Sequence, residues 1–173
     1  MVHGLHQPIP VLGSSAAVGG AHTRLQGPVL LAEDNQVNQE VALAMLQNLG
    51  LNYEMVTNGA DVLEILHRQS FDLILMDCQM PIMDGFQATV AIRQQEQFSA
   101  QHIPIVALTA NAVSGDRERC LACGMDDYLS KPFTQEQLGN LLAKEEIQTY
   151  LAALRARYKV EVNKAALEDT RER

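Results

Sequence analysis

Five short apolar segments alternate with stretches of helical periodicity between residues 28 and 143, and this alternation constrains the fold more than any other feature. The predicted strands cover residues 29–32, 53–56, 73–76, 103–108 and 127–130. The predicted helices follow them in turn, at about residues 37–49, 62–66, 85–96, 112–122 and 134–142. Short apolar strands that alternate with helices favour right-handed crossovers and a parallel sheet that is covered on both faces. The sequence therefore predicts an α/β fold.

Two local signals mark helix ends within this pattern. Gly50 follows the first helical stretch and suits the position just beyond a helix, where glycine allows a left-handed backbone. Thr134 and Gln137 have the spacing of a capping box, which predicts that the last helix of the alternating region begins there.

The net charge of −8 is distributed unevenly along the 173 residues. Residues 28–142 contain five Lys or Arg and fifteen Asp or Glu, whereas each flank carries a net charge of +1. We therefore predict one acidic domain at residues 28–143. Residues 1–27 are predicted to be a linker or disordered tail, and residues 144–173 a helical extension or linker.

Composition excludes several classes of protein. The 47% of hydrophobic residues suffice for a sizeable core, so the chain is not disordered throughout. The acidic charge argues against nucleic-acid binding. No apolar run approaches the roughly 18 residues that span a bilayer, and no secretory signal is evident. Three cysteines cannot build a disulfide framework, which fits a reducing cytoplasm.

Polar residues follow four of the predicted strands at their carboxyl ends. Glu33 and Asp34 follow the first strand, Asp77 the third, Thr109 the fourth and Lys131 the fifth. In open parallel sheets these strand ends meet at one edge, where ligands bind. Each residue alone has an ordinary interpretation, such as a helix cap at Asp34 or the neighbouring Asn35, or a solvent-exposed lysine at Lys131. Their joint occurrence at four strand ends favours a functional site.

The residue types at this edge are those of a phosphoryl site. Clustered carboxylates repel one another, and a hard divalent cation such as Mg²⁺ relieves that repulsion through oxygen ligands. Lys131 adds a fixed positive charge for an anion, and Thr109 adds a hydroxyl donor. Asp77 ends the most apolar strand and is the best candidate nucleophile, since a carboxylate can attack phosphorus to form an aspartyl phosphate.

The segments that carry these residues resemble those of response-regulator receiver domains. The matching segments are LLAEDNQVNQ (30–39), LILMDCQMPIMDG (73–85), IVALTANA (105–112) and MDDYLSKPF (125–133). The resemblance covers about residues 28–143 and is strongest to receivers attached to hybrid sensor histidine kinases. It implies a flavodoxin-like (βα)5 three-layer sandwich whose parallel sheet has the strand order 2-1-3-4-5.

The resemblance also implies roles for the acidic residues and their neighbours. Asp77 would accept a phosphoryl group from a phosphohistidine, and Asp34 would bind Mg²⁺ directly. Glu33 would act on the metal mainly through water, and the backbone carbonyl of Gln79 would complete the protein ligands. Gln79 and Asn111 match positions that tune the lifetime of the phosphoaspartate. Such a domain is an enzyme only in helping its own aspartate to gain and lose phosphate.

Further roles follow by position for residues on the later strands. Lys131 would pair with the phosphoryl group, and its peptide bond to Pro132 would be cis. Thr109 would hydrogen-bond a phosphoryl oxygen, and Tyr128 occupies the position of the switch aromatic. We hypothesise that the added charge, about −1 to −2, draws Thr109 and Lys131 inward and changes the surface of the fourth helix, fifth strand and fifth helix.

The implied partner is a histidine kinase or phosphotransfer domain that carries phosphohistidine. None of the five histidines has the context of a phosphodonor, and no Gly-rich nucleotide motif occurs. No nucleic-acid partner and no membrane contact are expected, and a homodimer is left open. A cytoplasmic location is expected, either for a separate protein or for the cytoplasmic part of a membrane-bound sensor kinase.

Two other classes of protein share part of this pattern. A phosphatase of the haloacid-dehalogenase type also uses a strand-end aspartate, Mg²⁺ and a lysine. It requires an acid two residues after the nucleophile, where this chain has Gln79. A pseudo-receiver that only binds partners is disfavoured by the complete set of acids.

The cysteines are interpreted as packing residues. Cys120 and Cys123 form a C-x-x-C within a predicted helix, and a lone pair of this kind is a weak signal for metal or redox chemistry. Cys78 is predicted to be a buried thiol at a strand end.

Overall fold

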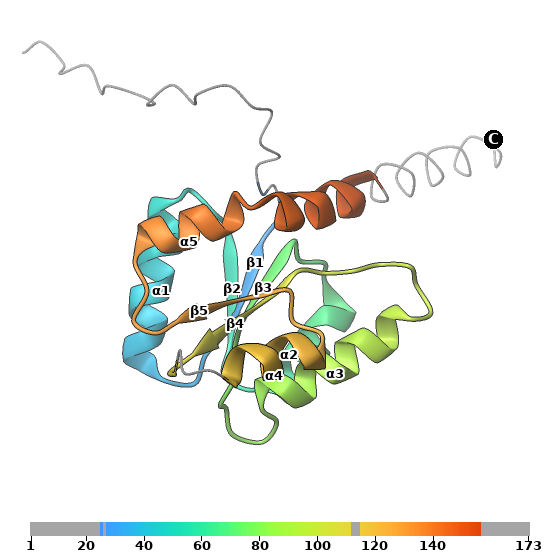
Figure 1. Cartoon of the computed structure of the whole chain (residues 1–173), viewed down its shortest axis with the longest axis horizontal. Helices are drawn as coiled ribbons and strands as arrows, with labels where there is room; N and C mark the ends of the chain where they lie inside the picture. Colours follow the sequence, from blue (N-terminus) through green and yellow to red (C-terminus); the bar gives the residue numbers. More distant parts are fainter. Residues whose placement is uncertain (1–24, 26, 112–114, 157–173) are drawn as a thin grey trace, which may run out of the picture.

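The structure is a computed structural model that describes residue 25 and residues 27–111 and 115–156. Five parallel strands form one sheet in the order β2-β1-β3-β4-β5 (Figure 1). The strands are β1 (Val29–Ala32), β2 (Tyr53–Val56), β3 (Leu73–Asp77), β4 (Ile105–Thr109) and β5 (Asp127–Ser130). This arrangement confirms the predicted fold class and strand order.

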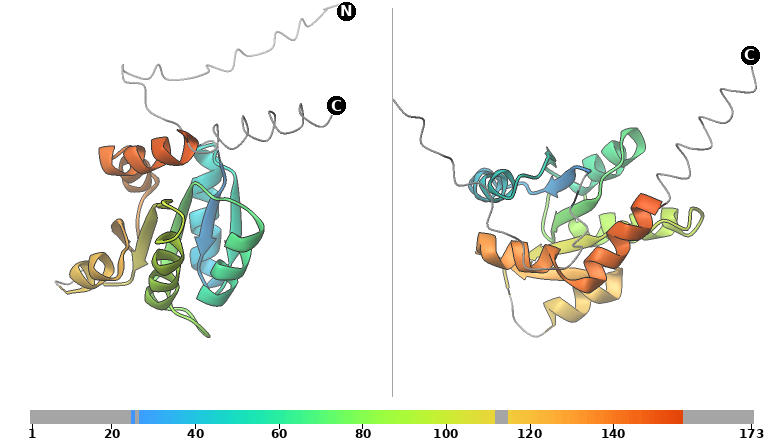
Figure 2. Two further views of the ribbon diagram at one scale, coloured as in Figure 1. Left: turned by 90° about the vertical axis from the view of Figure 1, so that its right-hand side faces the viewer. Right: turned by 90° about the horizontal axis from the view of Figure 1, so that it is seen from above.

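Helices cover both faces of the sheet. One face is covered by α1 (Gln36–Asn48) and α5 (Gln135–Leu142), the other by α2 (Gly59–Arg68), α3 (Gly85–Glu96) and α4 (Asp116–Cys123) (Figure 1, Figure 2). A further helix covers residues 145–156, after a break at residues 143 and 144. In the described part of the chain, no helix is long and apolar enough to cross a membrane.

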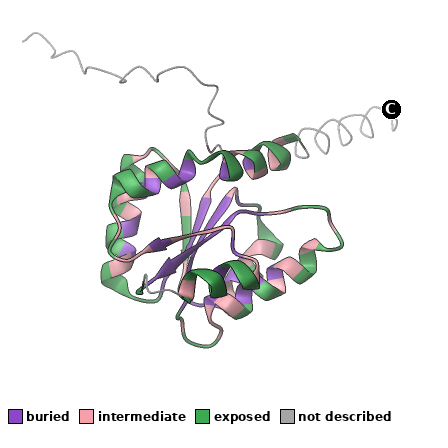
Figure 3. Ribbon diagram, viewed as in Figure 1, coloured by how far each residue is buried: buried purple, intermediate pink, exposed green. Residues whose placement is uncertain are grey.

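The central strands are buried because their side chains alternate between two cores. Along β1, Val29 and Leu31 face the core beneath α1 and α5, whereas Leu30 and Ala32 face the core beneath the other three helices. Both cores are apolar, so β1 and β3 are buried along their whole length, as the purple strands of Figure 3 show. This explains why these strands are continuous apolar runs rather than alternating ones.

Both helix-end signals of the sequence are present in the structure. Gly50, just beyond α1, has a φ of +72°, in the region that favours glycine. At the start of α5, Thr134 accepts a hydrogen bond from the backbone N–H of Gln137, and the Gln137 side chain accepts one from the backbone of Thr134. The capping box predicted for this helix is therefore confirmed.

Two elements begin later than predicted. β4 begins at Ile105 and not at residue 103, because the N–H of Ile103 donates to the Glu96 carboxylate (2.7 Å) and Pro104 has no N–H to pair. The fourth helix was predicted from residue 112, and α4 begins at Asp116. Residues 112–114 lie outside the described residues.

The helix at residues 145–156 contributes side chains to the core beneath α1 and α5. Ile147 and Leu151 are each 1% exposed and belong to this core together with Leu138. The Tyr150 ring lies 4.2 Å from the His102 ring, measured between centroids. The helix therefore packs as part of the same fold as the sheet.

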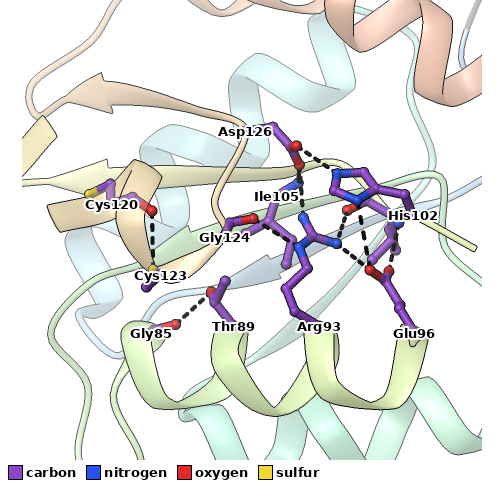
Figure 4. Close-up of polar contacts among 11 residues, drawn as sticks. Gly85, Thr89, Arg93, Glu96, His102, Ile105, Cys120, Cys123, Gly124 and Asp126 are labelled. Atoms are coloured by element: carbon purple, nitrogen blue, oxygen red, sulfur yellow. Dashed lines mark hydrogen bonds and ion pairs between the residues drawn. The ribbon is translucent and has the colours of Figure 1, made fainter. Parts of the chain in front are cut away.

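A network of charged groups around Arg93 fixes the turn between α4 and β5 (Figure 4). The guanidinium of Arg93 donates to the Asp126 carboxylate (2.8 Å), the Glu96 carboxylate (2.6 Å) and the Gly124 carbonyl (2.8 Å). Nε2 of His102 lies 2.6 Å from the second Asp126 oxygen. These contacts join α3 to the segment that leads into β5.

Candidate functional site

Five predicted site residues lie at the carboxyl edge of the sheet. Glu33 and Asp34 follow β1, Asp77 ends β3, Thr109 ends β4 and Lys131 follows β5. These four strands are successive neighbours in the sheet and run parallel, so their carboxyl ends lie side by side. The structure therefore brings the five residues together.

Three of them converge as carboxylates. Glu33, Asp34 and Asp77 each offer one oxygen, and these oxygens all lie within 4.8 Å of one another. Glu33 and Asp77 are buried, whereas Asp34 is exposed. Oxygen donors at this spacing, with one side open to water, suit a hard cation such as Mg²⁺, which keeps several waters in its coordination shell. The donor set therefore fits the predicted metal.

Lys131 lies among these carboxylates. Its Nζ is 2.9 Å from Oε2 of Glu33 and 3.3 Å from Oδ2 of Asp77. One ammonium group thus faces two buried carboxylates, which leaves a local excess of negative charge. The excess is a second reason why this edge suits a divalent cation.

Burial and charge shift the pKa values of these groups in different directions. Burial, reinforced by the charge of Glu33, raises the pKa of Asp77 to about 6, against the opposing N–H of Gln79 and the charge of Lys131. Burial also opposes ionisation of Glu33, but the Lys131 ammonium and the Asn35 N–H outweigh it and lower the pKa of Glu33. Burial would lower the pKa of Lys131, yet the two carboxylates raise it. The Lys131–Glu33 pair is therefore charged. The negative charge of Glu33 in turn makes ionisation of Asp77 less favourable.

Without Mg²⁺, Asp77→Asn is expected to raise the free energy of unfolding at about pH 7.5 by about 2 kcal/mol. The folded state holds the Asp77 proton more tightly than the unfolded chain, where the pKa is near 3.8. The contribution of Asp77 to wild-type stability should therefore fall as the pH rises from about 4 to about 6, and asparagine avoids this loss. Urea unfolding in EDTA across this pH range measures the difference, which should vanish near pH 4. A variant less stable than wild type at about pH 7.5 would contradict the expectation.

Thr109 is bonded to the segment that follows β4. Its hydroxyl donates to the backbone carbonyl of Asn111 (3.0 Å) and lies 3.4 Å from Oδ2 of Asp116 in α4. The N–H of Asn111 donates back to the Thr109 hydroxyl oxygen (3.2 Å). Thr109 itself is buried, while Asn111 is exposed. The hydroxyl thus connects the site to the start of α4.

The backbone around Asp77 and Lys131 is closely packed. The N–H of Gln79 donates to Oδ1 of Asp77 (3.2 Å), which orients the carboxylate. A Cβ on Gly85 would lie 2.1 Å from the carbonyl oxygen of Asp77, so only glycine allows α3 to begin so near the site. The Lys131–Pro132 peptide bond is cis.

Tyr128, the predicted switch aromatic, lies on β5 next to α4. Its ring is partly buried against the core beneath α2, α3 and α4. The guanidinium carbon of Arg117 lies 5.9 Å from the centre of this ring. The ring of Tyr128 therefore lies close to a charged side chain of α4.

Sequence reasoning missed the residues that hold the loop after β1. The Gln39 side chain, buried in α1, donates to the backbone carbonyl of Glu33 (2.7 Å). Nδ2 of Asn38 and the N–H of Asn35 lie 3.4 and 3.1 Å from Oε1 of Glu33. Of the two residues considered as a helix cap, Asp34 and Asn35, it is Asn35 that caps α1 by accepting from the N–H of Asn38. The only signal was a run of amide side chains in the first turns of a helix, where such residues commonly cap the helix or face solvent.

Comparison with known proteins places this chain in a family. A sequence profile of the response regulator receiver domain matches residues 29–143. Hybrid signal transduction histidine kinase K of Dictyostelium discoideum is 49% identical over 115 residues, which are 64% of this chain and 10% of that protein. Sensor histidine kinase GacS of Pseudomonas protegens is 43% identical over 119 residues, 67% of this chain and 13% of that protein. The chain thus spans about a tenth of the length of these relatives.

Solved structures agree with the sequence match. The receiver domain of sensor histidine kinase PA1611 from Pseudomonas aeruginosa, solved with a magnesium ion in its active site cleft, has a TM-score of 0.62 and 45% identity. The alignment covers 73% of this chain and 98% of that domain. The receiver of Saccharomyces cerevisiae Ssk1, solved with the phosphotransfer protein Ypd1, has a TM-score of 0.60 and 32% identity, with 66% of this chain and 85% of that one covered. The chain therefore belongs to the response regulator receiver domain family.

Proposed function

We propose that Asp77 accepts a phosphoryl group from a phosphohistidine on a kinase or phosphotransfer domain, with Mg²⁺ held by Glu33, Asp34, Asp77 and the backbone of Gln79. The observation that carries the proposal is the convergence of three carboxylates and Lys131 at one edge of the sheet. When bound, Mg²⁺ would neutralise charge on the carboxylates and on the incoming phosphoryl oxygens.

The residues of this chain have separate tasks in the proposed transfer. The Asp77 carboxylate, oriented by the Gln79 N–H, attacks phosphorus in line with the departing histidine nitrogen. Lys131 moves from its contact with Glu33 toward the phosphoryl group, and Thr109 exchanges its bond to Asn111 for a phosphoryl oxygen. Gln79 and Asn111, beside the site, govern access of water to the phosphoaspartate.

Release of the Thr109 hydroxyl would change α4, because Thr109 also contacts Asp116. Tyr128 lies beside α4 with Arg117 above its ring, so a shift of α4 alters the surroundings of Tyr128. The surface of α4, β5 and α5 would thereby differ between the two states. The chain would act as a receiver within a hybrid histidine kinase or its phosphorelay.

Exposed apolar side chains beside the site support a protein as the donor. Val37 and Val41 on α1 are 67% and 50% exposed, and Ile82 in the loop after β3 is 85% exposed. Val37 lies three residues after Asp34, and Ile82 lies five residues after Asp77. Apolar groups around a polar site are suited to a docking partner that excludes water during transfer.

Transfer from a phosphorylated histidine phosphotransfer protein tests the proposal. With Mg²⁺, label is expected to leave the donor and appear on wild type, but not on Asp77→Asn or in EDTA. Val37→Asp should slow transfer from the protein donor by about tenfold or more, because it places a charge in the docking surface, and leave labelling by a small phosphodonor unchanged. Glu54→Gln removes an exposed carboxylate of β2 and serves as the control. Full transfer to Asp77→Asn would contradict the proposal.

A further inference from the structure

The helix α4 contributes one fully buried side chain to the core, and its remaining contacts are made by partly or fully exposed side chains. Of its residues Asp116–Cys123, only Cys120 is buried, and it is fully buried. The helix follows Gly115, which provides no side-chain cap, and is followed by Gly124, whose φ is +110°. A short helix with one buried anchor depends strongly on the contact that this anchor makes.

That contact joins two thiols from distant parts of the sequence. Sγ of Cys120 lies 3.8 Å from Sγ of Cys78, which is also buried. Cys78 directly follows Asp77, and its backbone is held at both ends: its N–H donates to Leu108 (3.1 Å) and its carbonyl accepts from Gly85 (3.2 Å). The anchor of α4 therefore rests on the residue next to the proposed phosphoacceptor.

The two sulfurs are near enough to be joined. A disulfide bond is about 2.05 Å long, so the sulfurs need to approach by about 1.8 Å, and Cys120 belongs to a short helix in which it is the one buried residue. Cys123 lies one turn further along α4, partly exposed, with its thiol on the Cys120 carbonyl (3.1 Å) (Figure 4). It offers a second thiol that could compete for Cys120.

We propose that Cys78 and Cys120 are an oxidisable pair whose disulfide fastens α4 to β3 beside Asp77. Both S–H bonds break and one S–S bond forms. The two electrons and two protons pass to a two-electron oxidant. When the oxidant is hydrogen peroxide, it is reduced to two molecules of water. In this state α4 cannot leave the arrangement in which Asp116 contacts the Thr109 hydroxyl.

Burial sets the speed of this reaction. Both thiols are buried, so an oxidant cannot reach them while α4 is packed on the sheet. Oxidation should therefore proceed through transient opening of α4, and mild urea below the unfolding transition should accelerate it.

Oxidation of the full chain with hydrogen peroxide or diamide tests the pair. After alkylation under denaturing conditions, oxidised wild type is expected to carry one alkyl group, on Cys123, where the reduced protein carries three, and to yield one peptide pair that links Cys78 to Cys120. Cys123→Ala should behave like wild type, whereas Cys78→Ala and Cys120→Ala should not form the link. In the linked protein, amide hydrogen exchange of α4 should be slower than in the reduced protein, and dithiothreitol should reverse the change.

Three results would overturn the proposal. The first is that wild type forms no link between Cys78 and Cys120 after prolonged oxidation. The second is that Cys120 is linked to Cys123 instead. The third is that amide hydrogen exchange of α4 is the same in the linked and the reduced protein. The deciding measurements are made on wild type, so a result is obtained even if an alanine variant folds poorly. None of these measurements involves phosphate, so the outcome is independent of the proposed phosphoacceptor function.

Discussion

Replacing Ile147 and Leu151 together by alanine is expected to lower the free energy of unfolding by roughly 4–8 kcal/mol. Both side chains are 1% exposed and pack in the core beneath α1 and α5, although they lie beyond the residues that match the family profile. The expected loss approaches the whole stability of a small domain. Urea unfolding followed by circular dichroism measures this loss of stability. A double variant that is already unfolded without urea would also agree with the expectation.

The control for this pair is a pair of exposed apolar residues in another helix. Val37 and Val41 on α1 are 67% and 50% exposed, and alanine is a better helix former than valine. The double change to alanine at these positions should alter the free energy of unfolding by less than about 1 kcal/mol. If both double variants behaved alike, the helix at residues 145–156 would not be part of the folded core.

Gly85→Ala is expected to cost about 3 kcal/mol of stability and most of the phosphorylation of Asp77. The new methyl group would lie 2.1 Å from the Asp77 carbonyl oxygen and 2.9 Å from the Met76 side chain. Because the 2.1 Å contact is with backbone, either the first turn of α3 or the end of β3 must shift. A shift at β3 displaces the Asp77 carboxylate from Glu33 and Lys131.

Gly139→Ala provides the matched control for this substitution. Gly139 lies inside α5, where the nearest atom to an added Cβ is 4.0 Å away. Alanine should therefore be neutral or stabilise the helix by up to about 1 kcal/mol. Both variants are compared by thermal unfolding and by labelling with a small phosphodonor. Equal stability and equal labelling of the two would show that the site tolerates movement of α3.

Much of the fold was predictable because it depends on local patterns. The central strands β1, β3 and β4 are buried on both faces, which produces continuous apolar runs in the sequence. The carboxyl ends of parallel strands share one edge, so Asp77 and Lys131 could be placed together without knowledge of a contact between them. The same reasoning could not show that Lys131 lies nearer to Glu33 than to Asp77, since this depends on side-chain conformation.

Features that depend on long-range contacts were not predictable. The sequence indicated a helical extension or linker at residues 144–173 but not the surface on which its Ile147 and Leu151 pack. The sequence drew attention to Cys120 and Cys123, three residues apart, whereas the close sulfur contact joins Cys120 to Cys78, 42 residues away. The start of β4 was set by a side chain, Glu96, which takes the N–H that Ile103 would have offered to the sheet. In each case the deciding partner is far from the residue in sequence or bonded through a side chain.

The most direct test of the account is the mass of the intact chain after incubation with Mg²⁺ and a small phosphodonor such as acetyl phosphate. Wild type is expected to gain the mass of one phosphoryl group, Asp77→Asn is expected to gain none, and EDTA should abolish the gain in wild type. A wild-type chain that stays unmodified in Mg²⁺ would contradict the assignment of Asp77 as the phosphoacceptor, and equal modification of both proteins would place the phosphoryl group on another residue.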